Sequence, residues 1–491
     1  MNIVDKVVIV GGGSSAWLSA AYISNQCPHI DVTVIDKEIG TPIGVGEGTL
    51  LSFSKYMEDC GFNRDEWFHE IDATYKSGAW FPDWLEKGHD IWHPFNMSPL
   101  VDDTFRLQEL WAAHQDYDFK QFGVALYETA VKSNLVDSSN ISSYGYHVDA
   151  GKLVTFIQSR IKNRITFIAS DVVELIKAGN ILKAVQLADG SVVEGDLFID
   201  CTGFKSILRT EKKRKELIGR VFCDTAVCGQ IQYEDKNSEM RPYTRAQAVD
   251  HGWIWTIPTQ SRMGSGIIFN KNITDIEEAK EYLYTYWGGR LPKDNMRVID
   301  WTPYYLEDPW KDNVVCMGMS SGFIEPLEST GLALVQYQMW SLVNTVKSGF
   351  YTDKNVSVYN MEFCIRFEDC VDFVSSHYSK TNRTEKFWEY VKHTYKPTTG
   401  IMTHLKMLER GVLHQEQQQY THVFSGTNWT TWMAQLGYKI GDNCKLSKED
   451  SEHLLLRHYN TIEKYRPNWS QHHATEIARS IDYENFKTRN N

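Results

Sequence analysis

The chain has 491 residues, of which 42% are hydrophobic and 23% are charged, a composition typical of a packed globular protein. The formal net charge of −12 disfavours nonspecific binding to nucleic acids, because a polyanion is repelled by an acidic surface. No apolar stretch of the sequence approaches the roughly 20 residues that a membrane-spanning helix needs.

The cysteines of the sequence show no pattern of a metal site or of a disulfide framework. All nine are scattered singly from Cys27 to Cys444, and none forms a CxxC pair. The first apolar run ends in a glycine turn and does not resemble a secretory signal peptide. We therefore expect a protein of the reducing cytoplasm that binds no metal ion.

The first predicted elements form the start of a nucleotide-binding sheet. Residues 6–10 (KVVIV) are an apolar run without alternation, which is typical of a strand buried on both faces. Three glycines follow and lead into a helix of small residues over 14–24. A second apolar strand over 32–35 ends at Asp36. This order of strand, glycine turn, helix and strand predicts a Rossmann-type fold.

The glycine turn carries a variant of the GxGxxG dinucleotide motif. Gly11 permits the tight turn, Gly13 leaves room for a pyrophosphate, and Ala16 is small enough for the helix to pack closely. The N–H groups at the helix start favour an anion, and Asp36 is suited to bind a ribose hydroxyl. Taken alone, the motif leaves a plain glycine turn as the alternative.

Later parts of the chain return to this sheet. Residues 196–201 (DLFIDC) and 313–317 are strand candidates, and each precedes a glycine. Strands this far apart predict a nucleotide domain assembled discontinuously, with a substrate region inserted between them. Residues 220–310 are β-rich in pattern, and the chain turns helical from Leu332 onward. The expected class is an α/β fold with an inserted β-rich region and a helical C-terminal part.

Two glycine-containing segments are ambiguous by themselves. Residues 44–49 (GVGEGT) let the backbone pass close to a planar or phosphorylated ligand, but they equally suit a loop. Residues 322–331 (GFIEPLESTG) lead into a helix. The N–H groups of Thr330 and Gly331 at that helix start predict an anion cradle, with ordinary capping as the alternative.

A tryptophan-containing segment and one lysine do not indicate a function when each is taken alone. In a strand, Trp253 and Trp255 of the segment 253–258 (WIWTIP) point to the same face, and a core aromatic pair explains them equally well. Lys76 lies in the segment 73–80 (ATYKSGAW). One lysine among 51 basic residues is normally a solvated charge.

Together these segments resemble the flavin-dependent halogenases of the tryptophan-halogenase type. The family's WxWxIP motif stands at residues 253–258, and its GxGxxG motif departs slightly through Ala16. The resemblance runs in the expected order from residue 6 to about 390. The other matches are 43–47 (IGVGE), 73–78 (ATYKSG), 93–95 (HPF), 146–149 (YHVD), 196–203 (DLFIDCTG), 322–331 (GFIEPLESTG), 373–378 (FVSSHY) and 387–388 (FW).

The resemblance implies an FAD enzyme that converts halide and oxygen into hypohalous acid. A separate flavin reductase would supply the reduced FAD, because the chain has one dinucleotide motif and is not expected to oxidise NADH or NADPH efficiently. The halide, which is bromide, chloride or iodide, would lie near Thr330 and Gly331. The implied cofactor-binding positions are Gly11, Gly13, Ser14, Ala16, Asp36, Val45, Gly46, Glu47, Asp200 and Gly203.

The resemblance also implies the residues of the halogenation step. Lys76 would hold hypohalous acid by a hydrogen bond or as a haloamine, and Glu328 would be the second catalytic residue. Trp253 and Trp255 would separate flavin from substrate. The side chains of His93 and Phe95 would stack against a small aromatic substrate.

The C-terminal part departs most from the family. We expect residues 1–390 to form the FAD-binding halogenase module and residues 391–491 to form a helical part that covers the substrate. Tryptophan-specific members have a lid there that binds the amine and carboxylate of the amino acid, and no match to it is found. The aromatic residues of this part line a pocket or pack in a core; they are Tyr420, Phe424, Trp429 and Trp432. An indole-like or phenol-like substrate is therefore expected rather than free tryptophan.

Two other functions compete with this interpretation. A flavin monooxygenase that hydroxylates its substrate would share the nucleotide motif and the segment 196–203, and an inactive flavin-binding or redox-sensing protein would share the fold. Lys76, Glu328 and the WxWxIP segment favour the halogenase. The sequence leaves open the natural substrate, the substituted carbon, the preferred halide and whether the chain forms a homo-oligomer.

Overall fold

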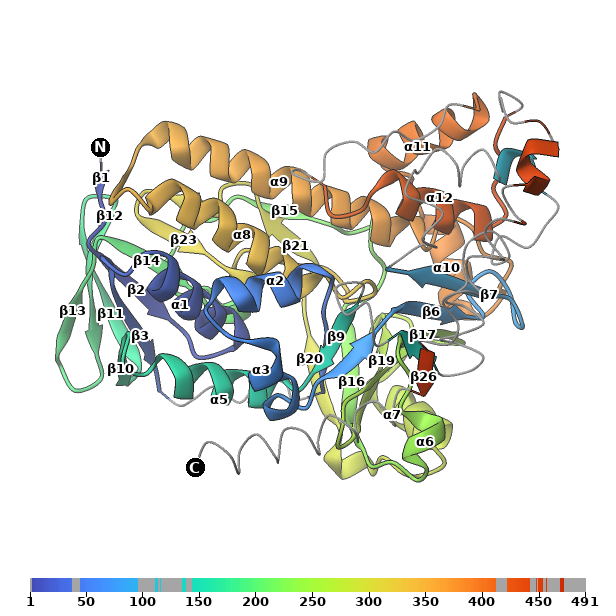
Figure 1. The fold of residues 1–491 in the computed structure, drawn as a ribbon, viewed down its shortest axis with the longest axis horizontal. Coiled ribbons are helices and arrows are strands. Elements are labelled where there is room, and N and C mark those ends of the chain that lie inside the picture. Colours follow the sequence, from blue (N-terminus) through green and yellow to red (C-terminus); the bar gives the residue numbers. More distant parts are fainter. Residues whose placement is uncertain are drawn as a thin grey trace. The chain divides into compact units, whose positions relative to one another are not determined.

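The computed structural model describes residues 2–37, 45–95, 111–113, 115, 135–137, 144–411, 422–441, 447, 449–453, 456 and 469–471 (Figure 1). The chain divides into two compact units, each assembled from three segments. Unit 1 comprises residues 1–73, 148–217 and 301–367, and unit 2 comprises residues 74–147, 218–300 and 368–491.

Unit 1 is built on a six-stranded sheet with the order β10-β3-β2-β14-β23-β22. All neighbouring pairs are parallel except β22–β23, which is antiparallel. The strands are β2 (Lys6–Val10), β3 (Asp31–Asp36), β10 (Thr166–Ala169), β14 (Leu197–Asp200), β22 (Trp310–Lys311) and β23 (Val314–Cys316). Parallel strands need crossover connections, so the insertion of long segments between them follows from this topology.

The side chains of β2 alternate between two packed layers. Val8 and Val10 join a buried cluster with Leu182 and Val185 of an antiparallel meander, so the meander covers one face of the sheet. The meander consists of β11 (Val172–Ala178), β12 (Ile181–Leu187) and β13 (Val192–Glu194). Helix α1 (Ser14–Gln26) packs against β2 and β3 and against helices α5 (Ala150–Ile161) and α8 (Thr330–Val346). Because both faces of the sheet are covered, β2 has no polar side chain between residues 7 and 10.

The remaining elements of unit 1 are helices and short strands. The helices are α2 (Ser52–Asp59), α3 (Arg64–Glu70), α5 (Ala150–Ile161), α8 (Thr330–Val346) and the first part of α9 (Asp353–Ser376), with 3-10 turns η4 (Gly203–Lys205) and η6 (Gly318–Ser320). The strands are β1 (Asn2–Ile3), β4 (Glu47–Gly48), β15 (Arg214–Glu216), β21 (Tyr304–Leu306), β24 (Gly322–Phe323) and β25 (Phe350–Tyr351).

Unit 2 is built on a seven-stranded sheet with the order β20-β16-β19-β18-β17-β6-β7. Its pairs are antiparallel except β17–β6. The strands are β6 (Gly78–Pro82), β7 (Asp90–Pro94), β16 (Thr225–Ile231), β17 (Thr244–Val249), β18 (Gly252–Pro258), β19 (Met263–Phe269) and β20 (Arg297–Asp300). Every residue of β18 and β19 is buried, so this sheet is covered on both faces at its centre.

Helices of unit 2 supply that cover. Helix α7 packs against β16 and β19 through a buried apolar cluster that includes Ala279 and Leu283. The helices are α6 (Lys236–Glu239), α7 (Ile276–Tyr286), the last part of α9, α10 (Lys386–Thr394), α11 (Thr399–Glu409) and α12 (Gly426–Gln435), with the 3-10 turn η5 (Lys293–Asn295). The other strands are β5 (Thr74–Lys76), β8 (Leu135–Asp137), β9 (Gly145–Val148) and β26 (Trp469–Gln471).

The predicted fold class is confirmed. The strands and the first helix expected around the glycine turn are present, and residues 220–310 hold five strands of the unit 2 sheet. The predicted boundary at residue 390 stays a prediction, since the two compact units divide the chain at other positions. Tyr420 and the C-terminal residues 472–491 lie outside the described part of the chain.

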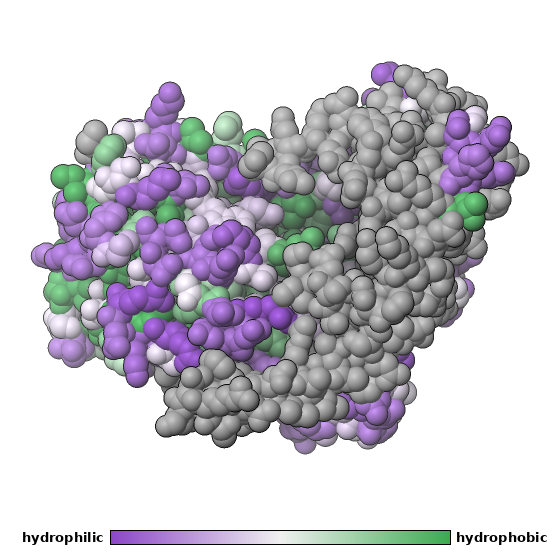
Figure 2. Space-filling view, in the orientation of Figure 1, coloured by the Kyte–Doolittle hydropathy of each residue, from purple (hydrophilic) through white to green (hydrophobic). Residues whose placement is uncertain are grey.

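On the face shown in Figure 2, the coloured residues are mainly hydrophilic, with small hydrophobic areas between them. None of the helices in the described part of the chain is long and apolar enough to cross a lipid bilayer.

Candidate active site

The first glycine of the nucleotide motif is required by the backbone of a neighbouring strand end. Gly11 has φ +122°, and a Cβ atom there would lie 2.4 Å from the carbonyl oxygen of Cys201. Its N–H donates to the carbonyl oxygen of Ile35 at 2.8 Å. The tight turn after β2 thus depends on the missing side chain at Gly11.

Gly13 instead borders open space. It is the N-cap residue of α1, and a Cβ atom placed there would have no described atom within 4 Å. The first turn of α1 carries no acidic side chain, so the N-terminal N–H groups and the helix dipole are available to an anion. Ala16 is fully buried one turn further on. This cradle fits a dinucleotide pyrophosphate such as that of FAD.

Glu47 lies beside the same helix start. The Ser14 hydroxyl donates to Glu47 Oε1 at 3.5 Å, and desolvation raises the pKa of the Glu47 carboxyl to about 7. Gly46 before it has φ +82°, and Val45 is half-buried. The segment 45–48 therefore brings a carboxyl that is easily protonated, together with backbone, to the predicted cofactor site.

Asp36 is the last residue of β3 and is half-buried. Its Oδ1 accepts a hydrogen bond from the Lys37 N–H at 3.0 Å. This position at the carboxyl end of a parallel strand is the usual one for a residue that binds a ribose.

Asp200 is placed differently from Asp36. It has no exposed surface, and its carboxylate accepts hydrogen bonds from the Leu208 N–H at 2.8 Å and from Ser320 Oγ at 3.1 Å, besides those from Thr202 and Ser206. Its carboxylate therefore holds the loop after β14 in place. Contact of this side chain with a cofactor stays a prediction.

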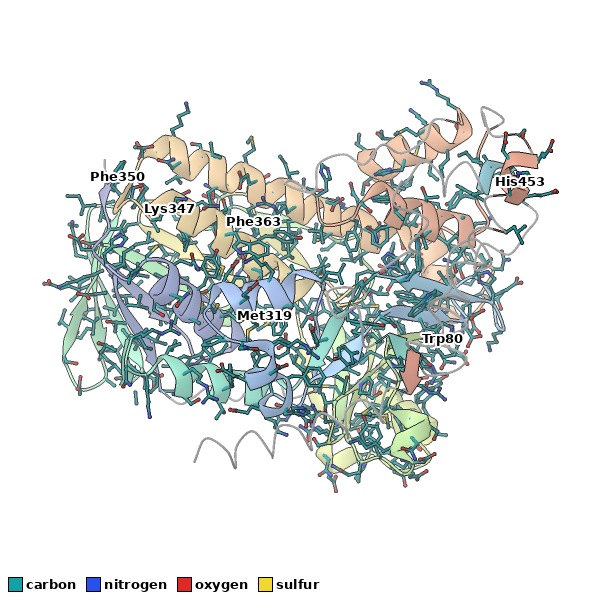
Figure 3. The ribbon with its side chains drawn as sticks, in the orientation of Figure 1. Trp80, Met319, Lys347, Phe350, Phe363 and His453 are labelled. Carbon is teal, nitrogen blue, oxygen red and sulfur yellow. The ribbon has the colours of Figure 1, made fainter. Side chains whose placement is uncertain are left out.

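Gly203 begins the turn that Asp200 organises. It has φ +66°, and a Cβ atom there would lie 3.6 Å from Cε of Met319, which is labelled in Figure 3. The turns η4 and η6, which follow two adjacent parallel strands, meet at this point. The predicted cofactor positions around Gly11 and Gly203 therefore share the carboxyl-terminal edge of one sheet.

The start of α8 combines an unusual backbone with a buried carboxyl group. Ser329 is the N-cap residue and has the left-handed φ of +58°, which a residue with a side chain seldom adopts. Thr330 and Gly331 form the first turn, where N–H groups have no partner within the helix. Glu328 is 2% exposed, whereas Gly331 is exposed. The predicted anion cradle thus lies at a real helix start.

Lys76 is almost completely buried in unit 2. It ends β5 and is 1% exposed. Its partner across the sheet is Gly145 of β9, which as a glycine places no side chain next to Lys76. Its Nζ lies 4.8 Å from the centre of the Phe95 ring, in cation–π geometry. An ordinary solvated lysine is thereby excluded.

His93 belongs to the edge strand β7 and is 1% exposed. Its ring centre lies 5.2 Å from that of Phe373 and 6.4 Å from that of Phe424. Phe373 and Phe424 stack on each other at 4.0 Å. His93 therefore borders an aromatic cluster formed by α9 and by the residues before α12.

The two tryptophans of β18 lie side by side as predicted, with ring centres 6.3 Å apart. Trp253 is 1% exposed and Trp255 is 7% exposed. This burial agrees with a core pair, and a role as partition between flavin and substrate stays a prediction.

Sequence reasoning missed two polar residues of unit 2. Asp369 of α9 is 7% exposed, and its Oδ2 accepts hydrogen bonds from the N–H groups of Val423 and Phe424 at 2.7 and 2.9 Å. Desolvation raises the pKa of the Asp369 carboxyl to about 7. Asn428 of α12 contacts His93. The sequence signal for Asn428 was its spacing from Ser425, Ser425-x-x-Asn428, which resembles a helix capping box.

Comparison with known proteins identifies the family. The family described as tryptophan halogenase matches residues 6–452. The chain belongs to the tryptophan halogenase family. It is 30% identical to the tryptophan 6-halogenase SttH of Streptomyces toxytricini over 79% of this chain and 81% of the relative. It is 26% identical to the tryptophan 7-halogenase RebH of Lentzea aerocolonigenes over 83% of this chain and 82% of that relative.

Solved structures agree with this family assignment. The tryptophan halogenase from Shewanella frigidimarina has a TM-score of 0.88 at 21% identity, and the alignment covers 96% of this chain and 97% of that chain. At that identity the likeness shows the fold. The chain is therefore a flavin-dependent halogenase of this family. Membership of this family does not favour the alternative function, that of a monooxygenase that hydroxylates its substrate.

Proposed function

We propose that this halogenase uses reduced FAD, oxygen and halide to make hypohalous acid, and that Lys76 delivers the halogen to an indole-like or phenol-like substrate. The observation that carries the proposal is the burial of Lys76. Burying the Lys76 amine to 1% exposure costs free energy, whether the amine is charged or neutral, unless neighbouring groups compensate. Buried ionisable residues of this kind are often found at functional sites.

The turn at Gly11, the open space at Gly13 and the start of α1 suit the FAD pyrophosphate, with Asp36 for the ribose. Bound reduced FAD supplies the activation of oxygen. A separate flavin reductase supplies the reduced cofactor, and the α8 start at Thr330 and Gly331 holds the halide.

Lys76 fixes the position of hypohalous acid, which would otherwise react without selectivity. Its neutral amine attacks the halogen of hypohalous acid: an N–halogen bond forms, the O–halogen bond breaks, and the departing hydroxide takes one amine proton and leaves as water. In the alternative, the Lys76 ammonium hydrogen-bonds the intact acid. The substrate ring then takes the halogen from nitrogen or oxygen, and the ring proton is lost to restore aromaticity. Glu328 acts as the carboxylate that stabilises the cationic ring before the proton leaves.

The departure of the C-terminal sequence from the family is the reason for a substrate other than free tryptophan, and helix α12 agrees with it. The named relatives act on tryptophan, so an indole is the first class to test. Helix α12 has the sequence GTNWTTWMAQ, which contains no ionisable side chain to bind an amine or a carboxylate. Trp429 and Trp432 of this helix are 2% and 0% exposed, so they pack in the core. We assign residues 391–491 to covering the substrate, and the enzyme to the cytoplasm.

The test is mass spectrometry after incubation with reduced FAD, oxygen, bromide and a panel of indoles and phenols. Brominated product that disappears when bromide is omitted supports the proposal. A product carrying one added oxygen, formed equally with and without halide, would contradict it. Rapid oxidation of NADPH by the purified protein alone would contradict the need for a separate reductase.

A further inference from the structure

Helix α12 is attached to the edge strand β7 by two side-chain amides. Gln435 binds the backbone of Trp92 twice: its Oε1 accepts from the Trp92 N–H at 2.9 Å and its Nε2 donates to the Trp92 carbonyl at 2.8 Å. One residue further along β7, Asn428 Nδ2 lies 2.9 Å from His93 Nε2. The helix therefore meets both the backbone of the edge strand and the side chain predicted to face the substrate.

The orientation of the Asn428 amide is fixed by its other partners. Its Oδ1 lies 2.7 Å from the backbone N–H of Ser425 and 2.9 Å from the Ser425 hydroxyl. A backbone N–H can only donate, so the atom facing it must be the amide oxygen. The Asn428 NH2 group consequently points at His93 and donates to it. His93 Nε2 must accept, which places the imidazole proton on Nδ1 and leaves the ring uncharged.

Two of the described elements beside His93 carry no charged side chain. Helix α12 (GTNWTTWMAQ) and the neighbouring strand β6 (GAWFP) contain no ionisable residue. Ionisable residues on the neighbouring elements include Asp369 and Asp372 of α9, His377 just after the end of α9, His404 of α11, which stacks on Trp429, and His422 before α12. Asp369 is engaged by two backbone N–H groups, and His377 Nδ1 is paired with the Phe373 carbonyl at 2.8 Å.

We propose that Asn428 is a positioning residue that keeps His93 as the neutral imidazole with its proton on Nδ1. The inference rests on the proposed function and on the expectation from the family resemblance that His93 stacks against the aromatic substrate. Electrophilic halogenation creates positive charge on the substrate ring. A protonated imidazole stacked on that ring at 1% exposure would repel the charge, whereas a neutral imidazole does not.

The tautomer is measured directly on the full-length protein labelled with 15N-histidine. Two-bond 15N–1H spectra at pH 7 distinguish a ring protonated on Nδ1, on Nε2 or on both, and H93F identifies the signal of His93. We expect the Nδ1-protonated neutral ring. A ring protonated on Nε2, or an imidazolium, overturns the proposal. This measurement needs no halogenation, so its failure is distinguishable from failure of the proposed function.

The functional test replaces Asn428 by Asp, which has the same shape and can still accept from Ser425. A carboxylate favours the imidazolium, so kcat of N428D relative to wild type should be at least about tenfold lower at pH 6 than at pH 8.5, with saturating reduced FAD and halide. In Q435L, which breaks the backbone attachment and leaves the His93 partner intact, the ratio to wild type should stay constant with pH. In N428D/H93F the pH dependence should disappear. A constant ratio in N428D, or a pH-dependent one in N428D/H93F, overturns the proposal.

Discussion

The indole of Trp255 occupies the space that a side chain at Gly266 would need. A Cβ atom at Gly266 would lie 2.2 Å from Cη2 of the indole and 2.6 Å from Cβ of Cys228. The two positions are paired across β18 and β19, so the glycine sets how deeply the indole can lie against the sheet.

We predict that Gly266→Ala displaces Trp255 and lowers the free energy of unfolding by about 1–3 kcal/mol, the usual cost of overpacking a core. Urea denaturation followed by tryptophan fluorescence measures both effects. The matched variant is Trp255→Phe: because the smaller ring removes the contact with the indole and leaves the one with Cys228, G266A/W255F should be more stable than the sum of the two single changes implies. Strict additivity would show that the two residues do not compete for space.

Gly13 and Gly11 should respond differently to substitution. A valine at Gly13 enters open space, so the apo protein should lose about 1 kcal/mol or less, while affinity for FAD should fall by at least about a hundredfold. Alanine at Gly11 meets the Cys201 carbonyl at a positive φ and should destabilise the apo protein strongly. Flavin fluorescence titration and thermal unfolding separate the two cases. Normal FAD affinity in Gly13→Val would place the cofactor elsewhere.

Glu47 should make FAD binding depend on pH. Its carboxyl is desolvated and has a pKa of about 7, and its ionised form would repel a pyrophosphate near Ser14. FAD binding should therefore raise the pKa further, and affinity should fall by up to about tenfold as pH rises from 6 to 8.5. Glu47→Gln keeps the shape and should bind FAD equally across this range. The same decline in the glutamine variant would assign the pH dependence to another group.

Much of unit 1 was predictable because its determinants are local. The apolar run 6–10, the glycines after it and Asp36 lie within about 30 residues, and periodicity with turn chemistry reports such elements well. Asp196–Cys201 and Asn313–Met317 were also found as strands, since buried parallel strands are continuous apolar runs.

The missed features depend on contacts between distant residues. Asp369 looks like a surface residue of an amphipathic helix, and only the approach of residues 423–424 shows that its carboxylate caps their N–H groups. Asn428 and His93 are 335 positions apart, so no local pattern links them. Lys76 shows the same limit: family motifs singled it out, but its burial became known only from the fold.

Asp369 should make the stability of the protein fall as pH rises. Its pKa is about 7 in the folded state, above the ordinary value of 3.8, so between about pH 4 and 7 the folded state holds a proton that the unfolded state has released. Asp369→Asn still accepts from Val423 and Phe424, and it should reduce this decline by about 1 kcal/mol per pH unit. Urea titrations from pH 4.5 to 7.5 measure the slope. The control is Asp189→Asn, at an exposed turn where the Ser191 hydroxyl lowers the pKa of the Asp189 carboxyl. In this variant the fall of stability with rising pH should remain.

The decisive prediction concerns Lys76. In Lys76→Ala, FAD affinity and oxygen consumption by the reduced enzyme should remain, because the predicted cofactor residues lie in unit 1 and Lys76 in unit 2. Halogenated product should fall by at least about a thousandfold, or roughly 4 kcal/mol of transition-state stabilisation. Product is quantified by mass spectrometry with an indole substrate and with a scavenger that removes free hypohalous acid.

Variants of Lys76 and of Glu328 show which property of each residue matters. Lys76→Arg keeps a positive charge but stays protonated and cannot form a haloamine, so it should not restore product. Glu328→Gln keeps the shape and loses the charge, and it should reduce the rate only about tenfold to a hundredfold. Full activity in Lys76→Arg would favour a hydrogen-bonded hypohalous acid over a haloamine. Near wild-type halogenation by Lys76→Ala, with the scavenger present, would show that this buried lysine has no part in the reaction.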